Sequence, residues 1–195
     1  MVEQNLVRAF PCKVVLFSGH MIDAPGRPNP RFPADQEPIA AAEVARMLDQ
    51  ISAGEGDIAI CGGACGGDLL FAEASLARQL VLELYIPFRE EEFLAKSVDF
   101  ADADWRSRFF AAKSRASLHI TPDEVGPDPA DEDPYERNNL HMLDAAMRFG
   151  PDKLDFICLW NGEGGDGPGG TQHLMQEVQS KGGRTHWLNT TELWK

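Results

Sequence analysis

Short apolar runs alternate with helix-like stretches along most of this chain, and two of the runs end in glycine-rich turns. The first turn, residues 61–68, reads CGGACGGD and follows the apolar run 57–61. The second turn, residues 164–171, reads GGDGPGGT and follows the run 154–160. A strand that ends in glycines and continues as a helix brings backbone N–H groups and a positive helix N-terminus to one point. Both turns therefore predict a site for phosphate or another anion.

The alternation itself predicts the fold. The expected strands are 13–18, 57–61, 80–87, 117–120, 154–160 and 184–188. The expected helices are 35–53, 68–79, 89–97, 103–115, 135–149 and 171–181, with a short helix at the C-terminus. A proline-rich loop (19–34) and an acidic loop (121–134) interrupt this order. Strands that alternate with helices predict an α/β, Rossmann-like fold with a mostly parallel sheet and helices on both faces. Such sheets bind ligands at the carboxyl ends of their strands.

Length and charge narrow the function classes. With 195 residues, the chain is expected to form a single domain spanning 1–195. Its 18 basic and 31 acidic residues give a net charge of −13, and no basic stripe is present, so nucleic acid is not an expected partner. No apolar stretch is long enough for a membrane span, and residues 1–10 lack the apolar core of a signal peptide. We expect a cytoplasmic protein without a membrane partner, and the sequence leaves self-association into a homo-oligomer open.

Metal and cofactor signatures are absent from the sequence. Cys61 and Cys65 are four residues apart, unlike a zinc knuckle, and the five histidines share no ligand spacing. Neither a GxxxxGK[ST] loop nor a GxGxxG turn in the first strand–helix unit occurs. We therefore expect no metal and no cofactor.

Three stretches resemble the SLOG superfamily, which includes DprA, the YpsA-type proteins and the LOG phosphoribohydrolases. Residues 61–73 (CGGACGGDLLFAE) are similar to the family's first glycine turn. Residues 167–171 (GPGGT) resemble the LOG-type PGGxGT loop with one residue missing, and 17–20 (FSGH) resemble a turn of YpsA-like members. The resemblance implies a Rossmann-like domain that binds a nucleotide or a nucleotide derivative above the sheet.

The candidate site residues come from these turns and from neighbouring strand ends. The candidate ligand-binding residues are Gly19, His20, Gly62, Gly63, Ala64, Gly66, Asp68, Asn138, Trp160, Gly167, Gly169, Gly170 and Thr171. Among them, the Gly169 and Gly170 N–H groups and Thr171 are the best candidates for a phosphate site.

Several of these residues have a structural alternative. Asp68 is expected either to cap the helix that follows it or to contact the ligand. Glu73 is either a solvated surface acid or a partner for a sugar. His20 is either a loop anchor or an acid–base group. Asn138 is either a helix cap or a hydrogen-bonding partner for a base edge, and the Trp160 indole is placed to stack on a base.

These patterns lead to a ranked set of functions. The first is a domain that senses or processes a small nucleotide signal. The second is a LOG-like N-glycosidase that hydrolyses a nucleoside monophosphate, with Asp68 and Glu73 as catalytic acids. LOG enzymes carry a glutamate three residues after the loop threonine, where this chain has Leu174, and this difference favours binding over hydrolysis. The third is a protein-interaction module with a vestigial pocket.

Overall fold

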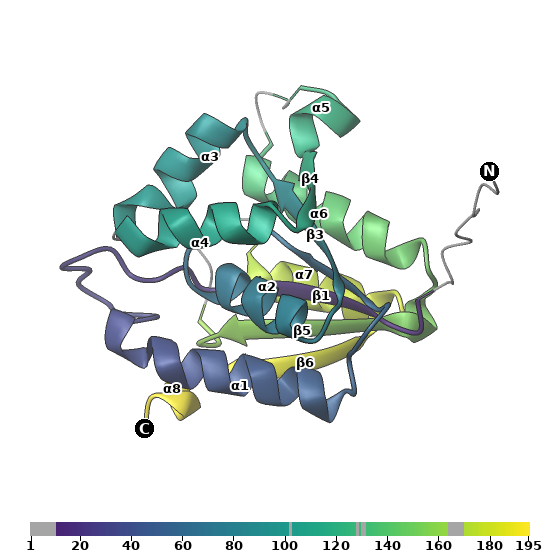
Figure 1. The fold of residues 1–195 in the computed structure, drawn as a ribbon, viewed down its shortest axis with the longest axis horizontal. Helices are drawn as coiled ribbons and strands as arrows, with labels where there is room; N and C mark the ends of the chain where they lie inside the picture. The colour runs from purple at the N-terminus through teal and green to yellow at the C-terminus, as the bar shows by residue number, and fades with distance from the viewer. Residues whose placement is uncertain (1–10, 102, 128, 130–131, 164–169) are drawn as a thin grey trace, which may run out of the picture.

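A six-stranded sheet forms the centre of the computed structural model, which describes residues 11–101, 103–127, 129, 132–163 and 170–195. The strands are β1 (Val14–Gly19), β2 (Ile58–Cys61), β3 (Val81–Ile86), β4 (Ala116–Ile120), β5 (Leu154–Trp160) and β6 (Arg184–Asn189). Every pairing is parallel, and the order is β4-β3-β2-β1-β5-β6 (Figure 1). The predicted α/β, Rossmann-like fold is confirmed.

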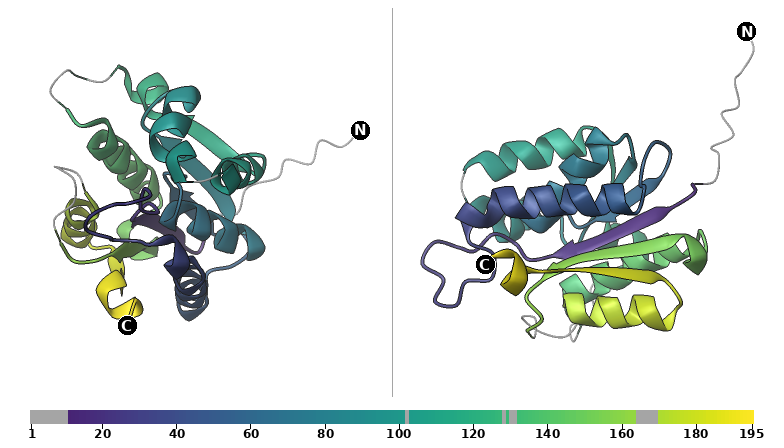
Figure 2. Two further views of the ribbon diagram at one scale, coloured as in Figure 1. Left: turned by 90° about the vertical axis from the view of Figure 1, so that its left-hand side faces the viewer. Right: turned by 90° about the horizontal axis from the view of Figure 1, so that it is seen from below.

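Helices cover both faces of the sheet (Figure 2). The α-helices are α1 (Glu37–Gln50), α2 (Gly67–Ala77), α3 (Glu90–Ser97), α4 (Ala103–Lys113), α5 (Thr121–Val125), α6 (Pro134–Met147), α7 (Thr171–Ser180) and α8 (Thr190–Leu193). Short 3-10 helices occupy Ala34–Gln36, Asp99–Ala101 and Pro151–Lys153. Apolar side chains of α1 to α4 pack in one core cluster, and those of α6 and α7 pack in a second cluster with residues of β1 and β5. Burial on both faces explains why β1, β2 and β5 are almost continuously apolar.

The strand order places a topological switch point between β1 and β5. From β1 the chain proceeds through β2 and β3 to β4 on one side, and it returns to the other side of β1 with β5. The helices that follow β1 and β5 therefore pack on opposite faces, and a crevice opens between the carboxyl ends of these two strands. The end of β1, the glycine turn after β2 and the N-terminus of α7 all lie at this edge of the sheet.

One of the two expected loops contains a short helix. Residues 121–125 form α5, within the stretch expected to be an acidic loop. Pro122 lies in its first turn, where a proline needs no N–H partner, and Asp123 and Glu124 favour the positive N-terminus.

The proline-rich segment is irregular as expected, and the Asp23 carboxylate holds it by accepting the N–H groups of Arg31 and Phe32 at 2.8 and 2.9 Å. No helix in the described part of the chain combines the length and the hydropathy needed to cross a bilayer.

Candidate functional site

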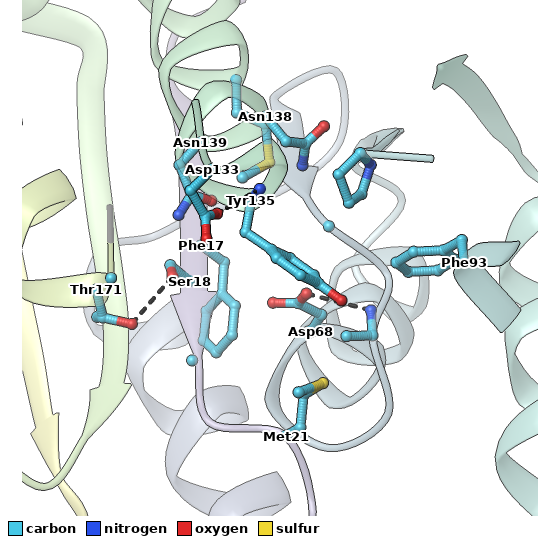
Figure 3. A pocket seen from close by; sticks show the side chains of 16 residues that line it. Phe17, Ser18, Met21, Asp68, Phe93, Asp133, Tyr135, Asn138, Asn139 and Thr171 are labelled. Atoms are coloured by element: carbon cyan, nitrogen blue, oxygen red, sulfur yellow. Dashed lines mark hydrogen bonds between the residues drawn. The ribbon is translucent and has the colours of Figure 1, made fainter. Parts of the chain in front are cut away.

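A cavity of about 340 Å³ lies at the carboxyl edge of the sheet, at the switch point (Figure 3). Its lining comes from the end of β1 and the segment after it, the first glycine turn, the segment after β3, α3, the N-terminal part of α6, and the first turns of α2 and α7. Seven candidates from the sequence line it: Gly19, Gly62, Ala64, Asp68, Asn138, Gly170 and Thr171. Gly63, Gly66, His20, Trp160 and Glu73 are not part of this lining. Gly167 and Gly169 lie outside the described residues.

The N-terminus of α7 is the strongest anion-binding feature of the cavity. Gly170 is its N-cap, and among the described residues no side chain caps this helix. The first intrahelical bond runs from the Leu174 N–H to the Gly170 carbonyl at 3.2 Å, so the N–H groups before Leu174 have no partner within the helix. Ser18 Oγ lies 3.1 Å from Thr171 Oγ1 and joins the end of β1 to this turn. The arrangement combines two hydroxyl groups with the positive end of a helix dipole.

The first glycine turn differs from the open anion site that the sequence predicts. Three of its N–H groups already donate to groups of the protein: Ala64 to the Asp68 carboxylate (3.2 Å), Cys65 to the Ser97 carbonyl (2.9 Å) and Gly67 to the His20 carbonyl (3.0 Å). A carboxylate of the chain itself therefore occupies part of the position that an anion would take. This turn is mainly a structural corner, and the N-terminus of α7, which no described side chain caps, is the more open of the two positions.

Gly66 shows why this corner needs glycine. Its φ of +92° lies in the region that other residues rarely adopt. A Cβ at this position would lie 2.5 Å from the Ile22 N atom, because Gly66 forms a β-bridge with Met21. The glycine thus joins the segment after β1 to the start of α2.

Asp68 is an acid of the cavity whose pKa is strongly raised. It is the second residue of α2, and its carboxylate bonds back to the turn, so the expectation that it caps the helix is wrong: the N-cap is Gly66, and no side-chain bond caps the helix. Burial raises the pKa of Asp68 to about 7, and the Ala64 N–H opposes this shift only in part. Near neutral pH the cavity therefore contains a carboxyl group that is able to donate or accept a proton.

His20 and Trp160 anchor the edge of the sheet. The Asn161 N–H donates to His20 Nε2 at 3.2 Å, which joins the segment after β1 to the end of β5. Burial, with the positive charge of Arg31 as a smaller cause, lowers the pKa of His20 to about 4. The Trp160 indole N–H donates to the Glu163 carbonyl at 2.7 Å, and the ring is buried. These contacts favour the anchoring alternative for His20, and they remove Trp160 from the group of stacking candidates.

Glu73 of α2 forms an ion pair with Arg108 of α4. Its two carboxylate oxygens accept from Arg108 Nε and Nη2, both at 2.7 Å, and Arg108 also pairs with Glu37 at 2.6 Å. Its side chain is outside the cavity lining, so of the two candidate catalytic acids only Asp68 reaches the cavity. Leu174, at the position of the family glutamate, is buried in the core.

Asn138 has structural partners at both ends of its amide. It donates to the Tyr85 carbonyl at 2.9 Å and accepts from the Thr121 hydroxyl at 2.6 Å, so it ties α6 to the ends of β3 and β4. Pro87, Phe93 and Tyr135 also line the cavity, and none of them is among the residues predicted for the site. The available signal was the position of Pro87, since it follows β3 at the same edge of the sheet.

The described residues contain no cluster of three or more histidine, cysteine, aspartate or glutamate side chains that is suited to a metal ion.

Together, the fold and the cavity define a Rossmann-like α/β protein with a ligand-sized site at its switch point. No protein-family model matches the chain, and no curated protein matches it. Among solved structures, the chain is similar to DNA processing protein A (DprA) from Streptococcus pneumoniae, with a TM-score of 0.42 and 14% identity. The match covers 95% of this chain and 61% of that one, so the chain spans about three fifths of the length of DprA. A similarity of this size says nothing about function.

Proposed function

We propose that this protein binds a nucleotide or a nucleotide derivative in the switch-point cavity, with the phosphate at the N-terminus of α7. The observation that carries the proposal is the position of this helix, whose first turn opens on the cavity beside the hydroxyls of Ser18 and Thr171. Backbone N–H groups and hydroxyls bind phosphate without needing a lysine or arginine. Sensing or processing a small nucleotide signal is the role that such a site suits.

The size of the cavity supports a ligand with about one phosphate and one base. Its volume of about 340 Å³ lies at the lower end of the range for small-molecule sites, about 300–1,000 Å³. The net charge of −13 disfavours a nucleic-acid backbone as ligand. We therefore expect negligible DNA binding at physiological salt.

Calorimetric titration with AMP, GMP, CMP, UMP and ribose 5-phosphate tests the proposal. Gly170→Val places a branched side chain at the N-cap of α7, on the cavity lining, and Thr171→Val removes a hydroxyl from the first turn of the helix. Both variants are expected to weaken phosphate-dependent binding. Thr191→Val is a matched control, because Thr191 lies exposed in the first turn of another helix, α8. Full affinity in folded Gly170→Val and Thr171→Val proteins would remove α7 from the site. If no probe binds the wild-type protein, the vestigial-pocket alternative replaces the proposal.

A second candidate function rests on Asp68. A carboxyl group with a pKa near 7 in a cavity is suited to general acid catalysis, and in an N-glycosidase it would protonate the departing base. The test is the release of free base from the four nucleoside monophosphates, followed over hours at high protein concentration. Turnover that is lost in Asp68→Asn and kept in Glu73→Gln would establish the hydrolase, whereas absence of base release leaves binding alone.

A further inference from the structure

The cavity has an aromatic end opposite its polar end. In Figure 3, Ser18 and Thr171 lie on one side of the cavity and Phe93 lies on the other, with Asp68 and Tyr135 between them. Pro87 also lines the cavity, and the ring of Phe88 packs edge-on against Tyr135 with centroids 5.3 Å apart. This aromatic end is lined by Pro87, Phe93 and Tyr135, and Phe88 packs against Tyr135 from outside the lining.

Tyr135 differs from its aromatic neighbours because it keeps an accessible surface. The residue is 41% exposed, while Phe88 and Phe93 are buried. Burial in the core therefore does not account for this residue, which lines the cavity. A tyrosine ring binds flat aromatic groups by stacking.

The Tyr135 ring is also held in place. Its hydroxyl lies 3.2 Å from the Ser97 hydroxyl, and its backbone N–H donates to the carboxylate of Asp133, the N-cap of α6, at 2.8 Å. Ser97 is fully buried, and its carbonyl accepts the Cys65 N–H, so the tyrosine joins α6 to the end of α3, which is itself bonded to the first glycine turn. A ring that is fixed before binding loses little conformational entropy when a ligand stacks on it.

The charge of the cavity limits what can occupy this end. Asp68 and Asp133 are the only acidic or basic side chains among the described residues that line the cavity, and Asp68 is the one that lies toward the aromatic end (Figure 3). A second phosphate at this end would lie beside Asp68 and would be repelled whenever that carboxyl group is ionised. An uncharged planar group meets no such penalty, and it would cover the apolar surface of the aromatic end.

We propose that Tyr135 is a specificity-determining residue that stacks on the base of the bound nucleotide, with the base at the aromatic end and the phosphate at α7. This inference rests on the proposed function, and it adds the orientation of the ligand and the residue that distinguishes a nucleotide from a sugar phosphate.

The experiment compares AMP and UMP with ribose 5-phosphate, which has the phosphate and the sugar but no base. Stacking of one base on an aromatic side chain corresponds to a change in affinity of about 5- to 150-fold. Tyr135→Leu is therefore expected to weaken AMP and UMP by a factor in this range and to leave ribose 5-phosphate within about twofold. Tyr135→Phe keeps the ring and is expected to retain most of the affinity that Tyr135→Leu loses.

Phe110→Leu is the matched control, since Phe110 is an exposed ring of α4 (40%) outside the cavity lining. Thermal melting confirms that each variant is folded. Equal losses for AMP and ribose 5-phosphate in Tyr135→Leu, or no loss for either, would overturn the role of Tyr135. Wild-type protein that binds ribose 5-phosphate as tightly as AMP would also overturn it and leave the phosphate site standing. Wild-type protein that binds neither would refute the proposed function itself.

Discussion

Replacing Asp68 by asparagine is expected to stabilise the protein more at pH 8 than at pH 5. Burial raises the pKa of Asp68 to about 7 in the folded state, from its usual value of 3.8. Between these values the folded protein keeps a proton that the unfolded chain has lost, so stability falls as pH rises through this window and is constant above about pH 7. Each pH unit in the window corresponds to about 1.4 kcal/mol. Asparagine does not titrate, and its amide oxygen is able to accept the Ala64 N–H in place of the carboxylate.

The measurement is urea unfolding of wild-type and Asp68→Asn protein at pH 5 and pH 8. The stability difference between variant and wild type should be more favourable to the variant at pH 8 by about 3 kcal/mol, since two pH units of the window lie between the two conditions. Comparing this difference at the two pH values removes the contribution of the other carboxylates, which titrate in both proteins. An equal difference at pH 5 and pH 8 would refute the assignment of a raised pKa to Asp68.

Three further outcomes are expected. Gly66→Ala should lower the free energy of unfolding by about 2–4 kcal/mol, because it adds a steric clash to a strained φ. Gly56→Ala is the control, because Gly56 has a similar φ of +84° and no atom within 4 Å of the added Cβ, so it should lose only the stability that the backbone strain costs. Equal losses of unfolding free energy for the two variants in urea would contradict the clash at Gly66. Glu73→Gln should lower the free energy of unfolding by about 0.5–1 kcal/mol, because it breaks a half-exposed ion pair. Its affinity for AMP, measured by calorimetry, should be unchanged, and a clear loss of affinity would return Glu73 to the site. Iodoacetamide at pH 8 should modify the exposed Cys12 of the native protein and leave Cys65 unmodified, because burial raises the pKa of Cys65 to about 12. Mass spectrometry reads out the labelling, and rapid labelling of Cys65 would contradict its burial.

The strands and most helices could be predicted because their signals are local. A strand buried on both faces is a short apolar run, and each of the six expected strands is present, with small shifts of its ends. Since the turns at one edge of a parallel sheet come together, the general position of the site followed from the same pattern. The helix α5 was missed because its acidic, proline-containing sequence is also typical of a loop.

Side-chain partners far apart in the sequence could not be predicted. Glu73 pairs with Arg108, 35 residues away, and only the packing of α2 against α4 brings them together. One local argument was available: five residues along a helix correspond to about 500°, so Asp68 and Glu73 lie about 140° apart around α2 and do not face one cavity. Of the two alternatives for Asp68, the capping role was wrong because α2 begins at Gly67, one residue before the expected start, so that Gly66 is the N-cap.

The position of the phosphate is the central claim, and ¹H–¹⁵N NMR titration of the protein with AMP and with inorganic phosphate tests it most directly. Both probes are expected to shift the amide signals of Thr171 and its neighbours in the first turn of α7 most strongly, and AMP alone is expected to shift the signal of Tyr135. The largest phosphate-induced shifts at Ala64 and Cys65, with the α7 amides unchanged, would contradict the account and place the anion at the first glycine turn.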